Sequence, residues 1–222
     1  MSRGIDRIGA SKPALFLACL LPLALIAWDI RVGDLGPDPV RALEHRTGIW
    51  AVRLLLATLA ITPLRLLTSR IFARGWTWLT RYRRMLGLFA FFYASVHFAI
   101  YLIVDLSGFW SQIIPEIIKK PFITVGFLAW LLMIPLAATS TRAMMRRLGG
   151  NWQRLHWLVY PIGLCGVLHF LWQVKFGKTI AVREPVMYLA IYLLLIAARI
   201  PTWRQRWLKQ RGHESIATAS AK

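Results

Sequence analysis

Six long runs of hydrophobic residues divide the chain, and short polar or basic segments separate them. The runs cover about residues 13–30, 48–67, 85–104, 122–139, 155–173 and 185–200. An α-helix needs about 20 apolar residues to cross the ~30 Å hydrocarbon core of a bilayer, and shorter runs suffice where flanking side chains extend outward. None of the runs shows the period-two alternation of a half-buried strand. The pattern predicts an all-α integral membrane bundle of six transmembrane helices.

Composition agrees with a membrane protein and leaves little chain for a soluble domain. Hydrophobic residues make up 57% of the 222 residues and charged residues only 17%, whereas a soluble domain contains about 25% charged residues. We expect a cytoplasmic N-terminus over 1–12, the helical domain over 13–200 and a basic cytoplasmic tail over 201–222. Because Asp29 and Arg31 end the first run without a small-residue cleavage site, a retained span is expected rather than a signal peptide.

The net charge of +19 is divided unevenly between two sets of loops. The segments between runs two and three and between runs four and five contain arginines and no acid, and the loops on the other side mix acids with bases. Lys and Arg accumulate in the cytoplasmic loops of membrane proteins, so both termini are predicted to be cytoplasmic. So little soluble chain remains that a folded basic surface for nucleic acid is not expected. The basic residues are Arg70, Arg74, Arg81, Arg83 and Arg84, then Arg142, Arg146, Arg147 and Arg154, then Arg199, Arg204, Arg206, Lys209 and Arg211.

Two histidines lie at matching depths inside apolar runs. His97 stands twelve residues after Met85, about 18 Å along a helix, and His169 stands fourteen residues after Leu155, about 21 Å. Both runs are expected to start at the cytoplasmic face, which makes the helices parallel and puts both rings in the outer half of the membrane. A polar ring in hydrocarbon is costly without a partner. Because two facing imidazoles commonly bind a metal, we predict haem ligation by this pair.

His156 is a third candidate ligand, near the cytoplasmic end of the fifth run. It precedes His169 by thirteen residues, about 20 Å along the axis, which suits two stacked cofactors. Thirteen residues also leave the side chains about 140° apart in azimuth, although Pro161 permits altered winding. Opposite His156 the third run offers Arg83 or Arg84 rather than histidine. An inner site is therefore asymmetric or ligated by another residue type, and a simple interfacial histidine is the alternative.

Arg53 lies about six residues into the second run from the outer face. A charge at this depth needs a counter-ion or must extend to the membrane surface. The propionate of an outer haem is one such counter-ion, so Arg53 is a candidate cofactor-binding residue, with extension to the surface as the alternative. The remaining histidines, His45 and His213, lie in polar segments and are expected to be solvated.

Several short motifs in combination resemble a known family. They are TGIW at 47–50 with TPL at 62–64, RRMLGL at 83–88, YASVH at 93–97 with Tyr101 and Asp105, and LHWLVY at 155–160 with HF at 169–170. With these motifs the chain resembles the haem-binding membrane subunit of the bacterial periplasmic methionine sulfoxide reductase system, formerly grouped with ferric-reductase-like transmembrane proteins. The resemblance covers essentially the whole chain.

The resemblance implies haem b, with the histidines of the family at His97, His156 and His169, and also FMN, for which no residue is assigned. It implies a multi-pass protein of the bacterial inner membrane that delivers electrons to a periplasmic molybdopterin-containing catalytic subunit, which repairs methionine sulfoxide in envelope proteins. No Gly-rich dinucleotide motif is present, so a cytoplasmic flavin reductase or quinol is the expected donor. The chain is then an electron-transfer subunit rather than the catalytic reductase.

Two other classes of function remain open at this point. A small ion or proton-coupled transporter without haem would bind its cargo with the membrane histidines and Arg53. Such carriers commonly contain inverted repeats, and we find no convincing repeat in this chain. A membrane anchor whose histidines merely pack is the third class, and the matched depth of His97 and His169 counts against it.

Overall fold

The computed structural model describes residues 3–71, 77–106, 109, 111, 113–174 and 179–201. Within these residues all regular secondary structure is helical, which confirms the predicted all-α class. The longer helices are α1 (Arg3–Val32), α2 (Pro39–Ile71), α3 (Arg83–Ile100), α5 (Pro121–Ala138), α8 (Val159–Gln173) and α9 (Thr179–Ala197). The shorter ones are η1 (Thr77–Arg81), η2 (Tyr101–Asp105), α4 (Ile113–Lys119), α6 (Arg142–Leu148), α7 (Gly150–Leu155) and η4 (His156–Leu158).

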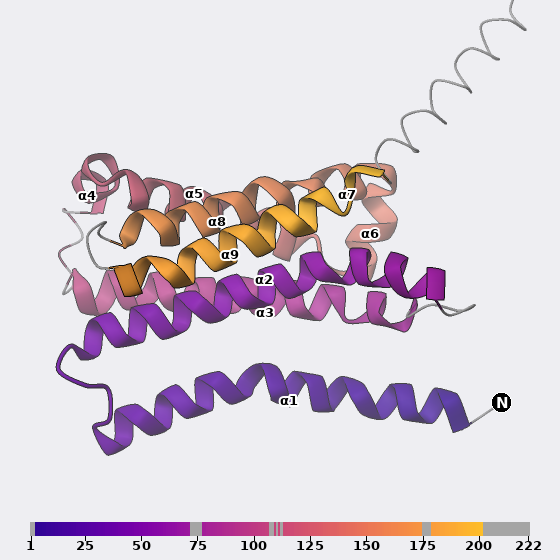
Figure 1. Cartoon of the computed structure of the whole chain (residues 1–222), viewed down its shortest axis with the longest axis horizontal. Coiled ribbons are helices and arrows are strands. Elements are labelled where there is room, and N and C mark those ends of the chain that lie inside the picture. The colour runs from indigo at the N-terminus through magenta and orange to yellow at the C-terminus, as the bar shows by residue number, and fades with distance from the viewer. Residues whose placement is uncertain are drawn as a thin grey trace, which may run out of the picture.

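The longer helices run along one common direction and form a bundle (Figure 1). α2 packs along α3, α5 packs along α8, and α8 packs along α9. α3 also contacts α5, and α2 contacts both α8 and α9, so these five helices enclose a common core. α1 lies beside α2 and α3 at the edge of the bundle. α4 lies at one end of the molecule, and α6, α7 and the N-terminus lie at the other end.

Five helical segments are long and apolar enough to cross a membrane, and they coincide with the first five predicted runs. They are Lys12–Val32, Pro39–Thr68, Leu79–Val104, Pro121–Ala138 and Gly150–Gln173. The chain is therefore a multi-pass membrane protein. The sixth run falls on α9, which packs within the bundle, and its crossing of the membrane stays a prediction, as does the cytoplasmic position of the termini. Arg74 and residues 202–222 of the predicted tail lie outside the described residues.

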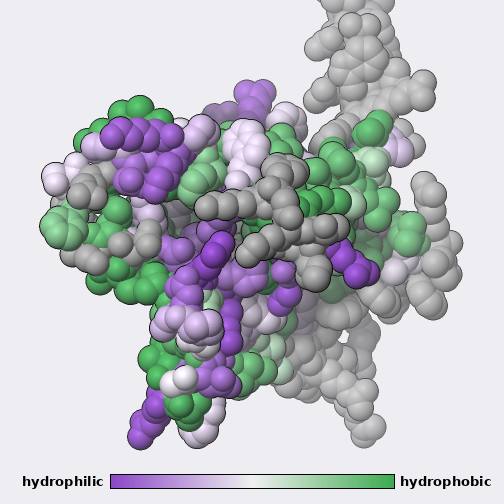
Figure 2. Space-filling view, turned by 60° about the vertical axis from the view of Figure 1, so that its left-hand side comes forward, coloured by the Kyte–Doolittle hydropathy of each residue, from purple (hydrophilic) through white to green (hydrophobic). Residues whose placement is uncertain are grey.

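Large hydrophobic side chains are exposed along the sides of the bundle. Leu17 and Leu25 of α1, Ile103 of the helical turn η2 and Leu194 of α9 are examples. Figure 2, in which the end carrying α4 comes forward, shows hydrophilic residues through the middle of the view and hydrophobic residues on both sides. A surface of this kind is expected where lipid rather than water contacts the protein, since apolar patches of this extent are rare on soluble monomers.

Two departures from α-helical winding lie close to the candidate ligands. η2 is a π-helical turn that continues α3 shortly after His97, and such turns are frequent at functional sites. η4 is a 3₁₀ turn that begins at His156 and leads into α8. It has about 3.0 residues per turn rather than 3.6, so it changes the azimuth between His156 and His169. Altered winding thus occurs before Pro161, which lies in the first turn of α8, where proline is tolerated.

Candidate cofactor site

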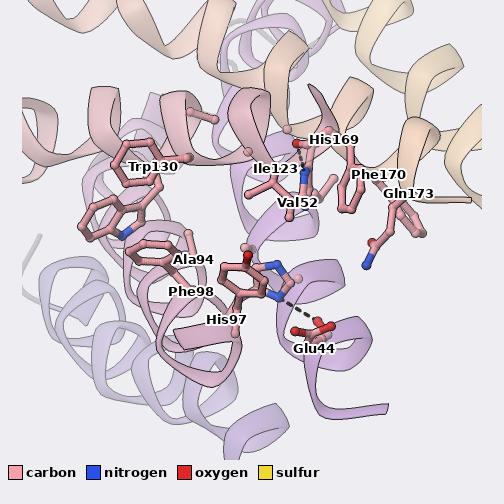
Figure 3. Close-up of a pocket in the computed structure, with 18 of the residues that line it drawn as sticks. Glu44, Val52, Ala94, His97, Phe98, Ile123, Trp130, His169, Phe170 and Gln173 are labelled. Carbon is pink, nitrogen blue, oxygen red and sulfur yellow. Dashed lines mark hydrogen bonds between the residues drawn. The ribbon is translucent and has the colours of Figure 1, made fainter. Parts of the chain in front are cut away.

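His97 and His169 lie next to each other inside the bundle (Figure 3). His97 belongs to the last turn of α3, and His169 lies in the C-terminal half of α8. Their ring centroids are 6.0 Å apart and their planes are inclined by 77°. The two rings that were placed at the same depth from the sequence are therefore brought together by the fold, while their role as metal ligands stays a prediction.

Backbone carbonyl groups orient both imidazoles in the same way. Nδ1 of His97 lies 2.9 Å from the carbonyl oxygen of Glu44, and Nδ1 of His169 lies 2.7 Å from that of Phe122. A carbonyl oxygen only accepts, so Nδ1 carries the proton in both rings and each Nε2 keeps its lone pair. The two hydrogen bonds run away from each other in Figure 3. This is the arrangement that metal-binding histidines adopt, with one ring nitrogen donating to a protein oxygen and the other facing the metal.

Two glycines let the neighbouring helices approach these rings closely. A β-carbon on Gly126 of α5 would stand 2.6 Å from Nδ1 of His169, and one on Gly48 of α2 would stand 3.2 Å from Nδ1 of His97. Thr47, which is fully buried, places its hydroxyl oxygen 3.5 Å from Nδ1 of His97. Each histidine is thus held against the backbone of a neighbouring helix as well as by a hydrogen bond.

The donor set of two imidazoles fits haem better than a bare metal ion. Among the residues that the structure describes, no three His, Cys, Asp or Glu side chains lie close enough to hold a metal, whereas a structural zinc site uses four protein ligands. Haem iron needs only axial ligands from the protein, because the macrocycle occupies the other positions. Metal–imidazole bonds of about 2 Å place two opposed rings about 6 Å apart between centroids, close to the 6.0 Å observed.

A cavity with mainly apolar walls surrounds the pair, and we call it the histidine cavity. It lies between α2, α3, α5 and α8, and its wall includes aromatic side chains from three of these helices. The ring of Phe98 packs on Trp130 at 4.7 Å between centroids, and the indole nitrogen of Trp130 donates to the hydroxyl of Ser95 at 3.0 Å. Further lining residues visible in Figure 3 are Val52, Ala94, Ile123 and Phe170. Apolar and aromatic walls of this kind suit a large flat ligand.

His156 lies in a second cavity, which we call the arginine cavity. Its wall includes Arg81, Arg83 and Arg84 together with His156. Nδ1 of His156 bonds to the carbonyl of Trp152 at 3.0 Å, and the two rings stack with centroids 3.9 Å apart. His156 therefore does not join the pair formed by His97 and His169, and its predicted role as a metal ligand stays a prediction.

Arg53 has protein partners in the N-terminal half of α2. Its Nε donates to the hydroxyl of Tyr188 at 2.7 Å, and its guanidinium lies 3.7 Å from the carboxylate of Glu184 and 5.1 Å from the ring of Trp50. Among the described residues that line the histidine cavity, Arg53 is not present, although His45 is. The predicted contact between Arg53 and a cofactor stays a prediction.

Sequence reasoning missed the residues that hold the two rings in place. Gly48 and Gly126 were not singled out, although small residues within apolar helices indicate close helix approach. The carbonyl groups of Glu44 and Phe122 carry no sequence signal, because every residue has one. Trp130 was not singled out either, and it lines the histidine cavity.

Comparison with known proteins agrees with the resemblance found in the motifs. The family described as ferric reductase like transmembrane component matches residues 47–167, a segment that includes His97 and His156 and ends just before His169. A protein of Xanthomonas campestris pv. campestris (strain 8004), named protein-methionine-sulfoxide reductase heme-binding subunit MsrQ, is 55% identical over 202 residues, covering 88% of this chain and 87% of its own.

Two other relatives with the same name extend this likeness. The protein from Xanthomonas axonopodis pv. citri (strain 306) is 51% identical over 226 residues, which cover 99% of this chain and 96% of that protein. The protein from Rhodospirillum rubrum is 46% identical over 203 residues, which cover 90% of this chain and 92% of that protein. The chain therefore belongs to the ferric-reductase-like transmembrane family and, within it, to the heme-binding subunits of protein-methionine-sulfoxide reductase.

Proposed function

We propose that this protein carries electrons across the bacterial inner membrane through haem b bound between His97 and His169. Electrons would pass to a periplasmic molybdopterin-containing catalytic subunit that reduces methionine sulfoxide in proteins. The chain is then the electron-transfer subunit of the system, and the catalytic reductase is its partner. The observation that carries the proposal is the orientation of the two imidazoles, each with Nδ1 on a backbone carbonyl and 6.0 Å between ring centroids.

The residues of the histidine cavity have distinct tasks in this proposal. His97 and His169 would hold the haem iron through Nε2, and the bound haem would supply one-electron transfer. Their hydrogen bonds to Glu44 and Phe122 fix the tautomer and increase the basicity of the ligand nitrogens. The aromatic and aliphatic walls exclude water, and a dry site of low polarity influences the reduction potential.

Two cavities in series support a path along the bundle. The histidine and arginine cavities share three lining residues, Leu55, Met133 and Ile162, all of which are buried. Two cofactors, one bound in each cavity, would be separated from each other by little more than this apolar layer. We place His156 at an inner cofactor site, and FMN is one of the cofactors in this proposal. The electron donor is a cytoplasmic flavin reductase or the quinol pool.

The direction of transfer follows from the distribution of charge. The sequence contains no acid between residues 47 and 104 or between 117 and 183, and these stretches include both arginine-rich loops. By the positive-inside rule the arginine cavity faces the cytoplasm and the histidine cavity faces the periplasm. The cofactor nearest the exported partner is therefore the one held by His97 and His169.

Absorption spectra of the purified protein, oxidised and then reduced with dithionite, test the proposal. We expect a sharp low-spin band on reduction, and its loss in the His97→Ala and His169→Ala variants, because each would remove one of the two residues that hold the haem. His213→Ala, in the polar tail, is the matched control and should keep the band. Absence of haem from the wild-type protein, or full haem retention in both cavity variants, would overturn the proposal.

A further inference from the structure

The histidine cavity has a polar end and an apolar end. Apart from the two candidate ligands and the indole of Trp130, its polar side chains lie at the end of the bundle that carries α4, which we call the α4 end. They come from the second turn of α2, the turn that follows α3, the residue before α5 and the last residue of α8. The apolar layer of Leu55, Met133 and Ile162 closes the opposite end. The described residues of the polar set are Glu44, His45, Tyr101, Lys120 and Gln173.

Two hydrogen-bond donors of this set lie one helical turn beyond the candidate ligands. Tyr101 follows His97 by four residues, and Gln173 follows His169 by four residues. Residues four apart share one face of a helix, so each donor lies on the same face as the imidazole that precedes it. Figure 3 shows Gln173 on the side of the histidine pair opposite Trp130. A flat ligand between the rings would therefore meet a hydroxyl and an amide donor at the same edge.

Lys120 provides positive charge at this edge. It is the single lysine or arginine among the described residues that line the histidine cavity. It directly precedes α5 and stands two residues before Phe122, whose carbonyl accepts the hydrogen bond of His169. Its ammonium group forms an ion pair with Glu116 of α4, and 49% of its side chain is exposed. An ammonium group carries three N–H donors, so this pair leaves donors for a second anion.

The two ends of the cavity match the two parts of a haem. The macrocycle is flat and largely apolar, and two propionate carboxylates extend from one of its edges. A carboxylate among Leu55, Met133 and Ile162 would be desolvated without a partner, which is costly. At the α4 end it can accept charge-assisted hydrogen bonds. The carboxylate of Glu44 lies at the same end, and because like charges repel, a propionate is expected beside the ammonium of Lys120 instead.

We propose that the propionates of the haem held by His97 and His169 point to the α4 end, where Lys120 neutralises one of them and Gln173 and Tyr101 donate hydrogen bonds. This inference rests on the proposed electron-transfer function. Lys120 and Gln173 are then positioning residues for the cofactor. The propionate edge faces the compartment of the electron acceptor, and the apolar edge faces the arginine cavity.

The ion pair between Lys120 and Glu116 gives this arrangement an electrostatic signature. Reduction adds one electron to the haem, so a neighbouring positive charge stabilises the reduced form and raises the reduction potential. Lys120 should raise the potential. Glu116 adds a negative charge beside Lys120 without lining the cavity itself, so it should lower the potential.

Potentiometric titration of the haem in the purified protein tests this pair of effects. Lys120→Gln should lower the reduction potential and Glu116→Gln should raise it. Each should change the reduction equilibrium by up to about fivefold, as expected of a partly exposed charge pair, which is about 40 mV at about 59 mV per tenfold for a one-electron couple. High salt should reduce both shifts, because it screens exposed charges. Lys119→Gln is the matched control, since Lys119 is exposed on α4 and is not among the described lining residues.

Haem dimethyl ester tests whether Lys120 and Gln173 act through the propionates, because esterification removes the carboxylate charges and leaves the macrocycle unchanged. Full-length protein produced without haem is titrated with haem or with the ester, and the low-spin band measures binding. Lys120→Gln should weaken haem binding by up to about fivefold and leave binding of the ester unchanged. Gln173→Leu should also weaken haem more than ester, with a smaller shift of potential than Lys120→Gln, because it removes no charge.

The outcomes separate this inference from the function on which it rests. A wild-type protein that binds no haem would overturn the proposed function, and this inference with it. A normal low-spin band with equal potentials in wild type, Lys120→Gln and Glu116→Gln would overturn this inference alone. Equal weakening of haem and ester in Lys120→Gln would show that the residue acts on the fold rather than on a propionate. A downward shift in Arg53→Gln but not in Lys120→Gln would assign the propionate to Arg53.

Discussion

The imidazole of His169 lies directly against the backbone of Gly126, so that any β-carbon at this position of α5 would stand 2.6 Å from Nδ1. The same Nδ1 bonds to the carbonyl of Phe122, one turn earlier in α5. One helix therefore sets both the position and the tautomer of this candidate ligand. Gly48 of α2 has the corresponding, looser relation to His97, at 3.2 Å.

Gly126→Ala should displace the His169 ring and weaken haem binding. Overpacking of this kind costs about 1–3 kcal/mol, which corresponds to a loss of about fivefold to a hundredfold in affinity. Gly48→Ala should have a smaller effect, because its β-carbon is 0.6 Å farther from the neighbouring ring. Haem content per protein and the reduced spectrum measure both effects. Gly150→Ala, where no atom lies within 4 Å, is the control, and equal haem loss in all three variants would contradict the steric explanation.

Tyr93→Phe should loosen α1 slightly, and Tyr93→Ala should do so strongly. The fully buried hydroxyl of Tyr93 donates to the carbonyl of Cys19 at 2.8 Å and accepts from the N–H of Leu23 at 3.1 Å, which inserts it into the backbone of α1. In the Phe variant those two backbone groups can bond to each other, so we expect a cost of about 1 kcal/mol. The Ala variant also leaves a cavity, for about 3–5 kcal/mol.

Thermal unfolding in detergent, followed by circular dichroism, compares the two Tyr93 variants. The haem band should survive in Tyr93→Phe, because the hydroxyl points to α1 and away from the histidine cavity. Similar midpoints for the Phe and Ala variants would show that the packing of this ring contributes little.

Arg199→Met should destabilise the contact between α2 and the turn that follows α9, where Arg199 lies. Pro63 has no N–H, which leaves the carbonyl of Leu59 without its usual partner within α2. Arg199 donates to that carbonyl and to the hydroxyl of Tyr160, and only 2% of its surface is exposed. Leaving such groups unsatisfied costs about 1–3 kcal/mol, and each kcal/mol lowers the unfolding midpoint by about 2–4 °C at this chain length.

Differential scanning calorimetry provides the measurement for the Arg199 variant. Arg142→Met is the control, since Arg142 is exposed on α6. Arg199→Lys should recover part of the loss, because one ammonium group replaces only part of the guanidinium contacts. An unchanged midpoint in Arg199→Met would contradict a structural role for this buried arginine.

Arg53→Gln should leave the haem band in place and change its reduction potential by little. The guanidinium is bound by Tyr188 and Glu184, and exposed ion pairs such as the one with Glu184 contribute only about 0–1 kcal/mol. Potentiometric titration of the haem, with Glu184→Gln as the matched variant, is the measurement. A large downward shift of the potential in Arg53→Gln alone would show instead that the arginine neutralises a haem propionate.

The local hydrophobic pattern was enough to predict the helical class and five of the membrane-spanning helices, although not the residues at which the helices end. The predicted span 48–67 corresponds to α2 at Pro39–Ile71, and the predicted span 155–173 is broken by η4 before α8 begins. Hydropathy indicates which residues lie in the apolar part of a helix. The helix itself extends into polar residues as far as its backbone hydrogen bonds continue. The predicted spans are therefore shorter than the helices of the structure where the polar flanking residues are also helical.

The sequence by itself determined the helices, the charge asymmetry and the common depth of His97 and His169, because each depends on residue type and on a fixed rise per residue. Only the tertiary structure decided that these rings face each other, that His156 lies in a separate cavity and that Arg53 pairs with Glu184. Rotation of a helix about its axis is set by packing against its neighbours. The contact of Gly126 with His169 also depends on this packing, because a glycine permits close approach only where a neighbouring helix lies against it.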